Sequence, residues 1–149
     1  MGFGLPSAIG AAMAYPEKTV ICFSGDGSIL MNIQELATLA DLKLNVKTII
    51  LNNKHLGLVR QQQELFYEKH YIASKFITNP DFATISNGFG VKGIDLSKEE
   101  NPMAVLKDEL LKPSPALINI PIKEDENVYP MVPPGKSNIE MIGGERNGK

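Results

Sequence analysis

Apolar and β-branched residues gather in four short runs along the chain, and these runs predict the strands of a sheet. The longest predicted strands cover residues 19–24 and 46–51. The second of them is a continuous apolar and β-branched run, which is typical of a strand buried on both faces. Shorter runs at residues 91–94 and 116–120 predict two further strands. Strands that are buried on both faces are typical of parallel sheets.

Helix signals alternate with these strands. Pro6 stands well at an early helical position, and Asn32 and Glu35 have the spacing of a capping box. Asn101 before a proline predicts another helix start. Helices are therefore expected from about residue 6, over 33–42, over 57–67, from 79–81 to 87–88, and over 101–111. This alternation predicts an α/β fold, a doubly wound and mainly parallel sheet with helices on both faces.

Length and composition favour one ordinary globular domain. The chain has 149 residues, of which 43% are hydrophobic and 21% charged. A net charge of −2 with scattered Lys and Arg excludes a basic surface for nucleic acid. The single cysteine, Cys22, lies in a predicted strand and is expected to be buried. No apolar run reaches membrane-spanning length and no leader is evident, so no membrane contact and a cytoplasmic location are expected.

The chain divides into a domain and an arm. Residues 1–127 are predicted to form the domain. Residues 128–149 are rich in Pro, Gly and charged residues, and are predicted to form a C-terminal arm that is partly irregular or disordered.

Two motifs carry the candidate chemistry. Gly25-Asp26-Gly27-Ser28 follows the first long strand, and Asn52-Asn53 follows the second, with 24 residues between Gly27 and Asn52. A βαβ unit of this length brings both strand ends to one edge of a parallel sheet. Carboxylate and amide oxygens suit Mg²⁺, and glycines let backbone N–H groups approach phosphates closely. Either motif alone is more often an ordinary turn, but together they predict a magnesium and phosphate site.

The surrounding sequence resembles a known family. The Gly-Asp-Gly and Asn-Asn spacing resembles that of thiamine diphosphate enzymes. The segments that resemble the acetolactate synthase (acetohydroxyacid synthase) catalytic subunit are residues 1–10, 25–32, 34–38, 56–63 and 128–135. The resemblance covers nearly the whole chain.

The resemblance implies roles for individual residues. Mg²⁺ would be bound by the carboxylate of Asp26, the side-chain amide oxygen of Asn53 and the backbone carbonyl of His55. Met1 would lie against the aminopyrimidine ring of thiamine diphosphate, with Leu58 near the cofactor and the substrate. The diphosphate would be reached by Gly25, Gly27, Ser28 and backbone N–H groups near Leu56, Gly57 and Leu58.

The resemblance also implies an enzyme larger than this chain. Acetolactate synthase condenses two pyruvates, or pyruvate and 2-ketobutyrate, with loss of CO₂ in branched-chain amino acid biosynthesis. The full enzyme would hold FAD in a missing middle domain, form a homo-oligomer and have a possible regulatory subunit. Its activating glutamate would come from a missing N-terminal domain, because Glu35, Glu64 and Glu68 lie in the wrong segments. We therefore expect no catalytic residue in this chain and no synthase activity from it alone.

Gln62 departs from the pattern of many relatives. It stands where they carry tryptophan, which leaves the preference for the second substrate open.

Three other interpretations stay open. The chain could belong to another thiamine diphosphate-dependent 2-oxoacid decarboxylase or carboligase, although residues 57–63 and 129–131 argue against this. It could be a non-catalytic module of a split enzyme. A dinucleotide-binding domain is a weaker alternative, because Gly2 and Gly4 follow no strand and lack the full phosphate fingerprint.

Overall fold

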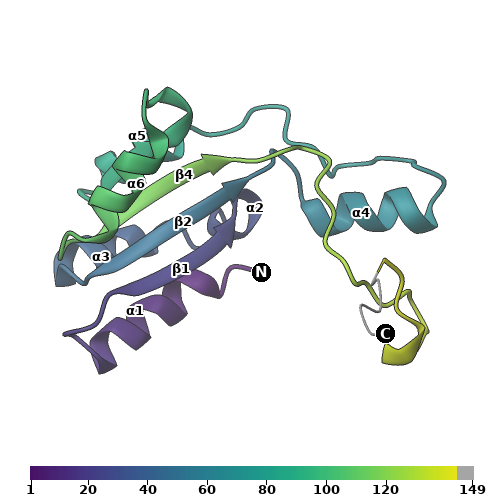
Figure 1. Cartoon of the computed structure of the whole chain (residues 1–149), viewed down its shortest axis with the longest axis horizontal. Helices are drawn as coiled ribbons and strands as arrows, with labels where there is room; N and C mark the ends of the chain where they lie inside the picture. Colours follow the sequence, from purple (N-terminus) through teal and green to yellow (C-terminus); the bar gives the residue numbers. More distant parts are fainter. Residues whose placement is uncertain (144–149) are drawn as a thin grey trace.

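A computed structural model describes residues 1–143, and its centre is a parallel four-stranded sheet (Figure 1). The strand order is β1-β2-β4-β3, and all three pairings are parallel. Strand boundaries lie within one residue of the predicted ones. The strands are β1 (Val20–Gly25), β2 (Val46–Asn52), β3 (Lys92–Asp95) and β4 (Ala116–Pro121).

Six α-helices and two short 3₁₀ helices connect and flank these strands within residues 1–143. None of these helices is long and apolar enough to cross a membrane. The five predicted helices are present, whereas α2 and both 3₁₀ helices were not predicted. They are α1 (Gly4–Ala14), α2 (Asp26–Ile29), α3 (Glu35–Leu42), α4 (Gly57–Phe66), α5 (Phe82–Gly88), α6 (Pro102–Leu110), η1 (Leu96–Lys98) and η2 (Asn138–Glu140).

The helix caps follow the sequence signals in two places and depart from them in one. Asp81 accepts the N–H of Thr84 before α5, and Asn101 accepts the N–H of Ala104 before α6. The predicted capping box of Asn32 and Glu35 is wrong. The Nδ2 of Asn32 instead donates to the carbonyl oxygen of Gly2 at 2.5 Å, and α3 begins later without a side-chain cap.

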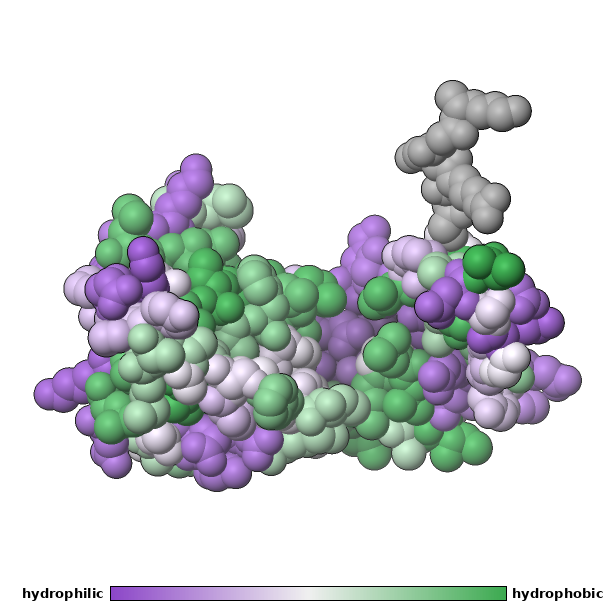
Figure 2. All heavy atoms as spheres, turned by 90° about the horizontal axis from the view of Figure 1, so that it is seen from below, coloured by the Kyte–Doolittle hydropathy of each residue, from purple (hydrophilic) through white to green (hydrophobic). Residues whose placement is uncertain are grey.

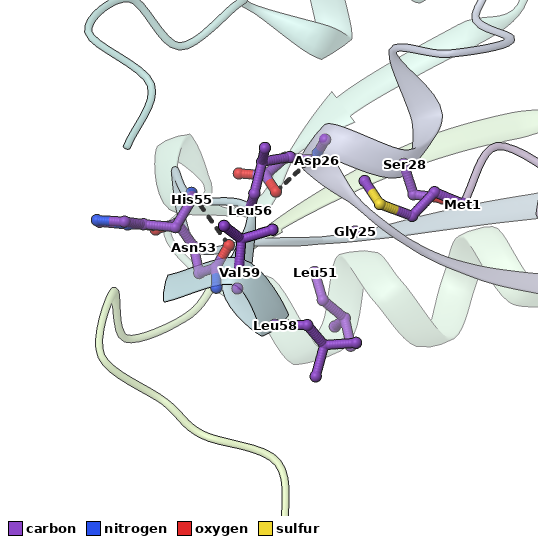
Figure 3. Close-up of a pocket in the computed structure, with 12 residues that line it drawn as sticks. Met1, Gly25, Asp26, Ser28, Leu51, Asn53, His55, Leu56, Leu58 and Val59 are labelled. Atoms are coloured by element: carbon purple, nitrogen blue, oxygen red, sulfur yellow. Dashed lines mark hydrogen bonds between the residues drawn. The ribbon is translucent and has the colours of Figure 1, made fainter. Parts of the chain in front are cut away.

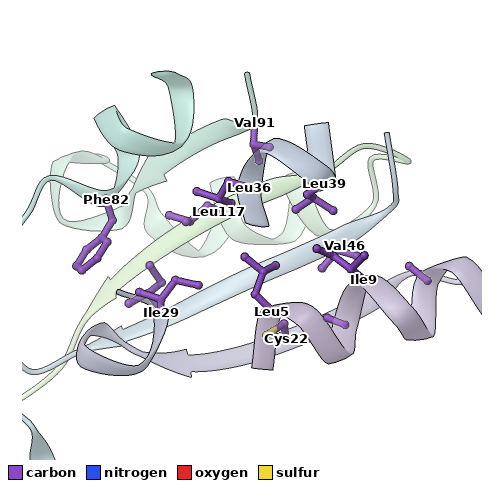
Figure 4. Packing of buried hydrophobic residues seen from close by; sticks show 13 residues of the cluster. Leu5, Ile9, Cys22, Ile29, Leu36, Leu39, Val46, Phe82, Val91 and Leu117 are labelled. Carbon is purple, nitrogen blue, oxygen red and sulfur yellow. The ribbon is translucent and has the colours of Figure 1, made fainter. Parts of the chain in front are cut away.

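The main core lies on one face of the sheet, where α1, α3 and α5 pack (Figure 4). Helices contribute Leu5, Leu36 and Phe82 to it, and strands contribute residues such as Ile50 and Leu117. Cys22 belongs to this cluster, as predicted, and burial raises the pKa of its thiol. This core fixes the sheet against three helices.

The opposite face is covered by α6 over β3 and β4 only. There Ile94, Leu96 and Ile118 form a second cluster, with Val105 and Leu106 of α6 packed against it. The predicted doubly wound arrangement, with helices on both faces, is therefore confirmed.

The β1 end of this second face stays exposed. Ile21 and Phe23 of β1 are 47% and 65% exposed. Seen from the side where α1 and β1 lie, apolar residues form much of the visible surface (Figure 2). The side chains of β1 are thus more exposed to solvent on this face than on the face that α1 packs against.

A charged cluster with two buried members, Lys47 and Glu109, lies at the opposite end of the strands from the Gly-Asp-Gly motif. Lys47 of β2 is fully buried, and its Nζ donates to the carbonyl oxygen of Ser114. Burial lowers the pKa of Lys47, and the nearby carboxylate of Glu109 opposes this shift. Glu109 itself bonds Lys92 and Lys112. The predicted strand 46–51 is buried on both faces over residues 46–50, whereas Leu51 at its end is 38% exposed.

Helix α4 and the C-terminal arm lie beyond the carboxyl end of the sheet, away from the other helices (Figure 1). The arm is only partly irregular in the described residues. Met131 and Ile142 form an antiparallel bridge, and Ser137 and Glu140 form a capping box around η2. The last part of the predicted arm, residues 144–149, lies outside the described residues.

Candidate functional site

A pocket of about 210 Å³ opens at the edge of the sheet where β1 and β2 end. Its lining residues come from the start of the chain, the end of β1 with α2, the end of β2 with the turn after it, and the first turn of α4 (Figure 3). The structure brings all ten predicted site residues together here, while their binding roles stay predictions. The pocket is lined by Met1, Gly25, Asp26, Gly27, Ser28, Leu51, Asn53, His55, Leu56, Gly57, Leu58 and Val59.

Asp26 contributes a buried carboxylate with one free oxygen. It is the first residue of α2 and only 1% exposed. Its Oδ1 accepts the N–H of Gly27 at 2.8 Å, whereas Oδ2 has no hydrogen-bond partner within residues 1–143. Burial raises the pKa of Asp26, and the N–H groups of Gly27 and Lys54 oppose this shift only in part. A buried oxygen without a partner is costly, and a bound cation would remove that cost.

The turn after β2 carries the other two predicted metal ligands. The Oδ1 of Asn53 accepts the N–H of His55 at 3.2 Å, and the Nδ1 of His55 lies 2.9 Å from the carbonyl oxygen of Asn53. Lys54 between them has a left-handed φ of 58°. Because the Lys54 N–H also acts on the Asp26 carboxylate, this turn lies beside Asp26. The Asn-Asn pair thus consists of the last residue of β2 and the first residue of the turn after it, and this turn lies at the candidate metal site.

The beginning of α4 supplies backbone donors to the pocket. Gly57, Leu58 and Val59 line it, and N–H groups in the first turn of a helix have no partner within the helix. Such a helix end favours anions. The N–H of Leu56, however, donates to the carbonyl oxygen of Ser74 at 2.8 Å. In this structure the Leu56 N–H already has a partner, and the predicted contact between Leu56 and a diphosphate stays a prediction.

Two of the site glycines permit close packing around the pocket. A Cβ atom on Gly27 would lie 2.5 Å from the Cδ2 of Leu56, and one on Gly57 would lie 2.9 Å from the Nδ2 of Asn53. A Cβ atom on Gly25 would meet nothing within 4 Å. A side chain on Gly27 or Gly57 would thus displace the side-chain end of Leu56 or Asn53, whereas Gly25 leaves open space at the pocket.

Ser28 connects the motif to the beginning of the chain. Its Oγ accepts the N–H of Gly2 at 2.9 Å. Met1, which is 72% exposed, is thereby held beside the pocket. The Ser28 hydroxyl can still donate its own hydrogen to a ligand.

Leu51 and Val59 also line the pocket and were not predicted as site residues. Leu51 ends the apolar run of β2, and alternation along a strand shows which residues share a face but not which lie beside a ligand. Val59 lies in the same first helical turn as Gly57 and Leu58, so the predicted helix start could have indicated it.

The donor set fits Mg²⁺ and does not resemble a site built from protein ligands alone. Within residues 1–143, no three His, Cys, Asp or Glu side chains gather in a way that could hold a metal ion. Mg²⁺ is usually bound through one or two carboxylates together with substrate phosphates and water. One carboxylate, one amide oxygen and one backbone carbonyl beside a helix start agree with that pattern.

Comparison with known proteins connects this geometry to a family. Residues 1–120 match the family described as "Thiamine pyrophosphate enzyme, C-terminal TPP binding domain". A solved structure, the thiamine diphosphate-dependent 4-hydroxybenzoylformate decarboxylase of Rhodococcus jostii RHA1, is similar with a TM-score of 0.76 and 33% identity. The similarity covers 85% of this chain and 24% of that chain.

Curated relatives include several acetolactate synthase large subunits. The isozyme 1 large subunit of Escherichia coli (strain K12) is 53% identical over 96% of this chain and 25% of its own length. The large subunit of Parasynechococcus marenigrum (strain WH8102) is 49% identical over 96% of this chain and 23% of its own length. The chain thus spans about a quarter of the length of these relatives. It belongs to the thiamine pyrophosphate enzyme family as a C-terminal TPP-binding domain, homologous to that of acetolactate synthase large subunits.

Proposed function

We propose that the pocket binds the diphosphate of thiamine diphosphate together with Mg²⁺. The observation that carries this proposal is the Oδ2 of Asp26, a buried carboxylate oxygen without a partner at the rim shared by β1 and β2. Asn53 and His55 lie in the adjacent turn and would complete the protein ligands of the metal. The helix start at Gly57 would face the diphosphate.

Each part of the pocket then has a distinct task. Asp26, the Asn53 amide oxygen and the His55 carbonyl hold the metal, and Gly25, Gly27, Ser28 and the first turn of α4 hold the diphosphate. Met1 and Leu58 lie where the organic rings would continue. When bound, thiamine diphosphate supplies the carbanion chemistry by which 2-oxoacids lose CO₂.

The chain contributes an anchor and not the whole active site. Asp26 is the one carboxylate among the twelve lining residues. The three glutamates considered from the sequence are occupied or placed elsewhere: Glu35 accepts from Thr38, Glu64 pairs with Arg60, and Glu68 lines a different pocket. Activation of the cofactor would therefore depend on a glutamate from another domain.

For the whole protein we propose acetolactate synthase activity. It would condense two pyruvates, or pyruvate and 2-ketobutyrate, in the cytoplasm. FAD, further domains, a homo-oligomer and a regulatory subunit belong to this proposal. High identity to several acetolactate synthase large subunits supports it. A 2-oxoacid decarboxylase is the second candidate, because the R. jostii decarboxylase shares the fold at 33% identity.

Titration calorimetry directly tests whether the pocket binds thiamine diphosphate and Mg²⁺, which is the proposed anchor. Thiamine diphosphate is expected to bind the chain only when Mg²⁺ is present, and Asp26→Asn is expected to weaken binding at least tenfold, since a metal ligand is lost. Asp41→Asn is the matched control, because Asp41 is exposed on α3, away from the lining residues. Mg²⁺-independent binding, or equal binding by the Asp26 variant, would refute the anchor. NAD titrated in parallel tests the dinucleotide alternative.

A turnover assay separates the anchor from the enzyme. With pyruvate, thiamine diphosphate and Mg²⁺, the chain alone is expected to form no acetolactate. Acetolactate formation would show that this chain contains its own activating group.

A further inference from the structure

Asn52, the first asparagine of the Asn-Asn pair, is fully engaged inside the protein. It is 4% exposed, and its Nδ2 donates to the Oδ1 of Asn119 at 3.0 Å. Its Oδ1 accepts two hydrogen bonds, from the N–H of Lys54 at 3.2 Å and from the Nδ2 of Asn79 at 3.1 Å. An amide oxygen has two acceptor positions, and both are filled here. Asn52 therefore cannot itself be a metal ligand without losing an internal bond.

The bond to Lys54 controls the shape of the turn after β2. Lys54 has a φ of 58°, which is unfavourable for a residue with a Cβ atom. A side-chain oxygen that accepts the N–H two residues later stabilises a turn of this type. Asn53 makes the same kind of bond to His55, so two such turns follow one another. The first of them sets the direction in which the second begins.

The side-chain amide of Asn52 is in turn hydrogen-bonded to neighbouring parts of the sheet edge. Its partner Asn119 lies on β4, where it is paired in register with Asp95 at the end of β3. Asn79 reaches it from the segment before α5. Polar side chains, of which Asn52 and Asn119 are buried, thus lie in a row across the ends of β2, β4 and β3, beside the turn that carries Asn53 and His55. Because both acceptor positions of the Asn52 oxygen are filled, these bonds restrict the movement of its side chain.

We propose that Asn52 is a positioning residue for the metal site. It acts through the N–H of Lys54 and fixes where the side chain of Asn53 and the carbonyl of His55 point. This inference rests on the proposed function, because it assigns a role toward the Mg²⁺–diphosphate anchor. Mg²⁺ requires near-ideal octahedral geometry, whereas Ca²⁺ accepts a flexible shell. Loosening the turn therefore harms Mg²⁺ binding more than Ca²⁺ binding.

The test compares metal preference in three variants. Calorimetry measures thiamine diphosphate binding with saturating Mg²⁺ and with saturating Ca²⁺. Asn52→Ala is expected to weaken the Mg²⁺-supported affinity about tenfold and the Ca²⁺-supported affinity less than threefold. Asn52→Ser keeps a weaker acceptor for the Lys54 N–H and is expected to fall between the parent and the alanine variant. Asn45 lies just before the first residue of β2, at the end of the strand far from Asn52. Asn45→Ala is expected to leave the ratio of Mg²⁺-supported to Ca²⁺-supported affinity unchanged.

Amide hydrogen exchange gives a readout that needs no ligand. In the free protein, Asn52→Ala is expected to speed amide exchange at Lys54 and His55. Amides of α6 are expected to exchange at the parent rate, once both rates are corrected for any difference in the free energy of unfolding. Equal loss of Mg²⁺- and Ca²⁺-supported affinity, or unchanged exchange at Lys54, would overturn the positioning role while leaving the anchor intact. If the parent chain binds no thiamine diphosphate, the proposed function fails and this inference fails with it.

Discussion

Both functional groups of the Gln61 side chain are bonded to the backbone of one residue, Val128. The Nε2 of Gln61 donates to the Val128 carbonyl oxygen at 2.8 Å, and its Oε1 accepts the Val128 N–H at 3.0 Å. Gln61 lies on α4 and is 1% exposed, whereas Val128 begins the C-terminal arm. One side chain therefore joins the helix beside the pocket to the last segment of the chain.

Gln61→Ala is expected to release the arm. Both hydrogen bonds are lost together, so amide exchange at Val128 should rise at least tenfold, and limited proteolysis should cut residues 122–143 faster. Gln62→Ala is the control, because the neighbouring side chain faces outward. Unchanged exchange at Val128 in the Gln61 variant would show that other contacts hold the arm.

Glu109 is expected to stabilise the fold in a pH-dependent way. Burial alone would raise the pKa of this carboxyl, but hydrogen bonds from Lys92 and Lys112 outweigh it and lower the pKa below its usual value. A lowered carboxyl pKa contributes stability above the unfolded pKa, and that stability is lost as the pH falls through the folded pKa. Glu109→Gln should therefore cost about 1 kcal/mol near pH 7, because both lysines are partly solvent-screened.

Urea unfolding at several pH values checks this expectation. The difference between the parent and Glu109→Gln should shrink as the pH falls from 7 to below 4. Glu99→Gln, at an exposed position, should show little difference at any pH. A difference that grows on acidification would contradict the assigned direction.

Gly93 is expected to be intolerant of any side chain. A Cβ atom there would lie 2.1 Å from the carbonyl oxygen of Ala83, a backbone atom of α5 that cannot move alone. Gly93→Ala should destabilise the protein by about 3 kcal/mol, measured by chemical denaturation. Gly10→Ala is the opposite case, because a Cβ atom on that helical residue meets nothing within 4 Å. It should gain about 0.5–1 kcal/mol, and equal effects at both positions would refute the packing argument.

Ser28 is expected to affect ligand binding at the pocket by holding Gly2, and with it Met1, in place. Ser28→Ala removes the acceptor of the Gly2 N–H, so Met1 should become more mobile and thiamine diphosphate affinity should fall a few-fold. The melting temperature should change little, because Met1 is exposed. Ser7→Ala, which removes another hydroxyl near the same end, should leave affinity unchanged. NMR relaxation of the Met1 methyl group reports the mobility.

The sequence predicted the strands well because their signals are local. The runs at 46–51 and 116–120 became β2 and β4 within one residue. The candidate site could also be predicted from the sequence, because parallel strands bring Asp26 and Asn53 to one edge of the sheet whatever the details of packing. The predicted residues that follow these two strands line one pocket for that reason, and Met1 joins them through the bond between Gly2 and Ser28.

What the sequence did not reveal depends on contacts between distant residues. The capping box at Asn32 failed because the Glu35 N–H donates to the backbone carbonyl of Asn32, while the side-chain amide of Asn32 is held by the carbonyl oxygen of Gly2, thirty residues away. The N–H of Leu56 is taken by Ser74, whose position follows from the path of the whole 67–81 segment. The partners of Asn52 come from β4 and from the segment before α5, and no local pattern indicates them.

The consecutive bonds from Asn52 to Lys54 and from Asn53 to His55 also bear on the entropy of ligand binding. Fixing the backbone of one residue costs roughly 1–2 kcal/mol, and residues 53–55 have already lost that freedom when the chain folds. A ligand arriving at this turn need not order it again. The heat of binding should therefore report mainly new contacts and released water, with little contribution from loop ordering.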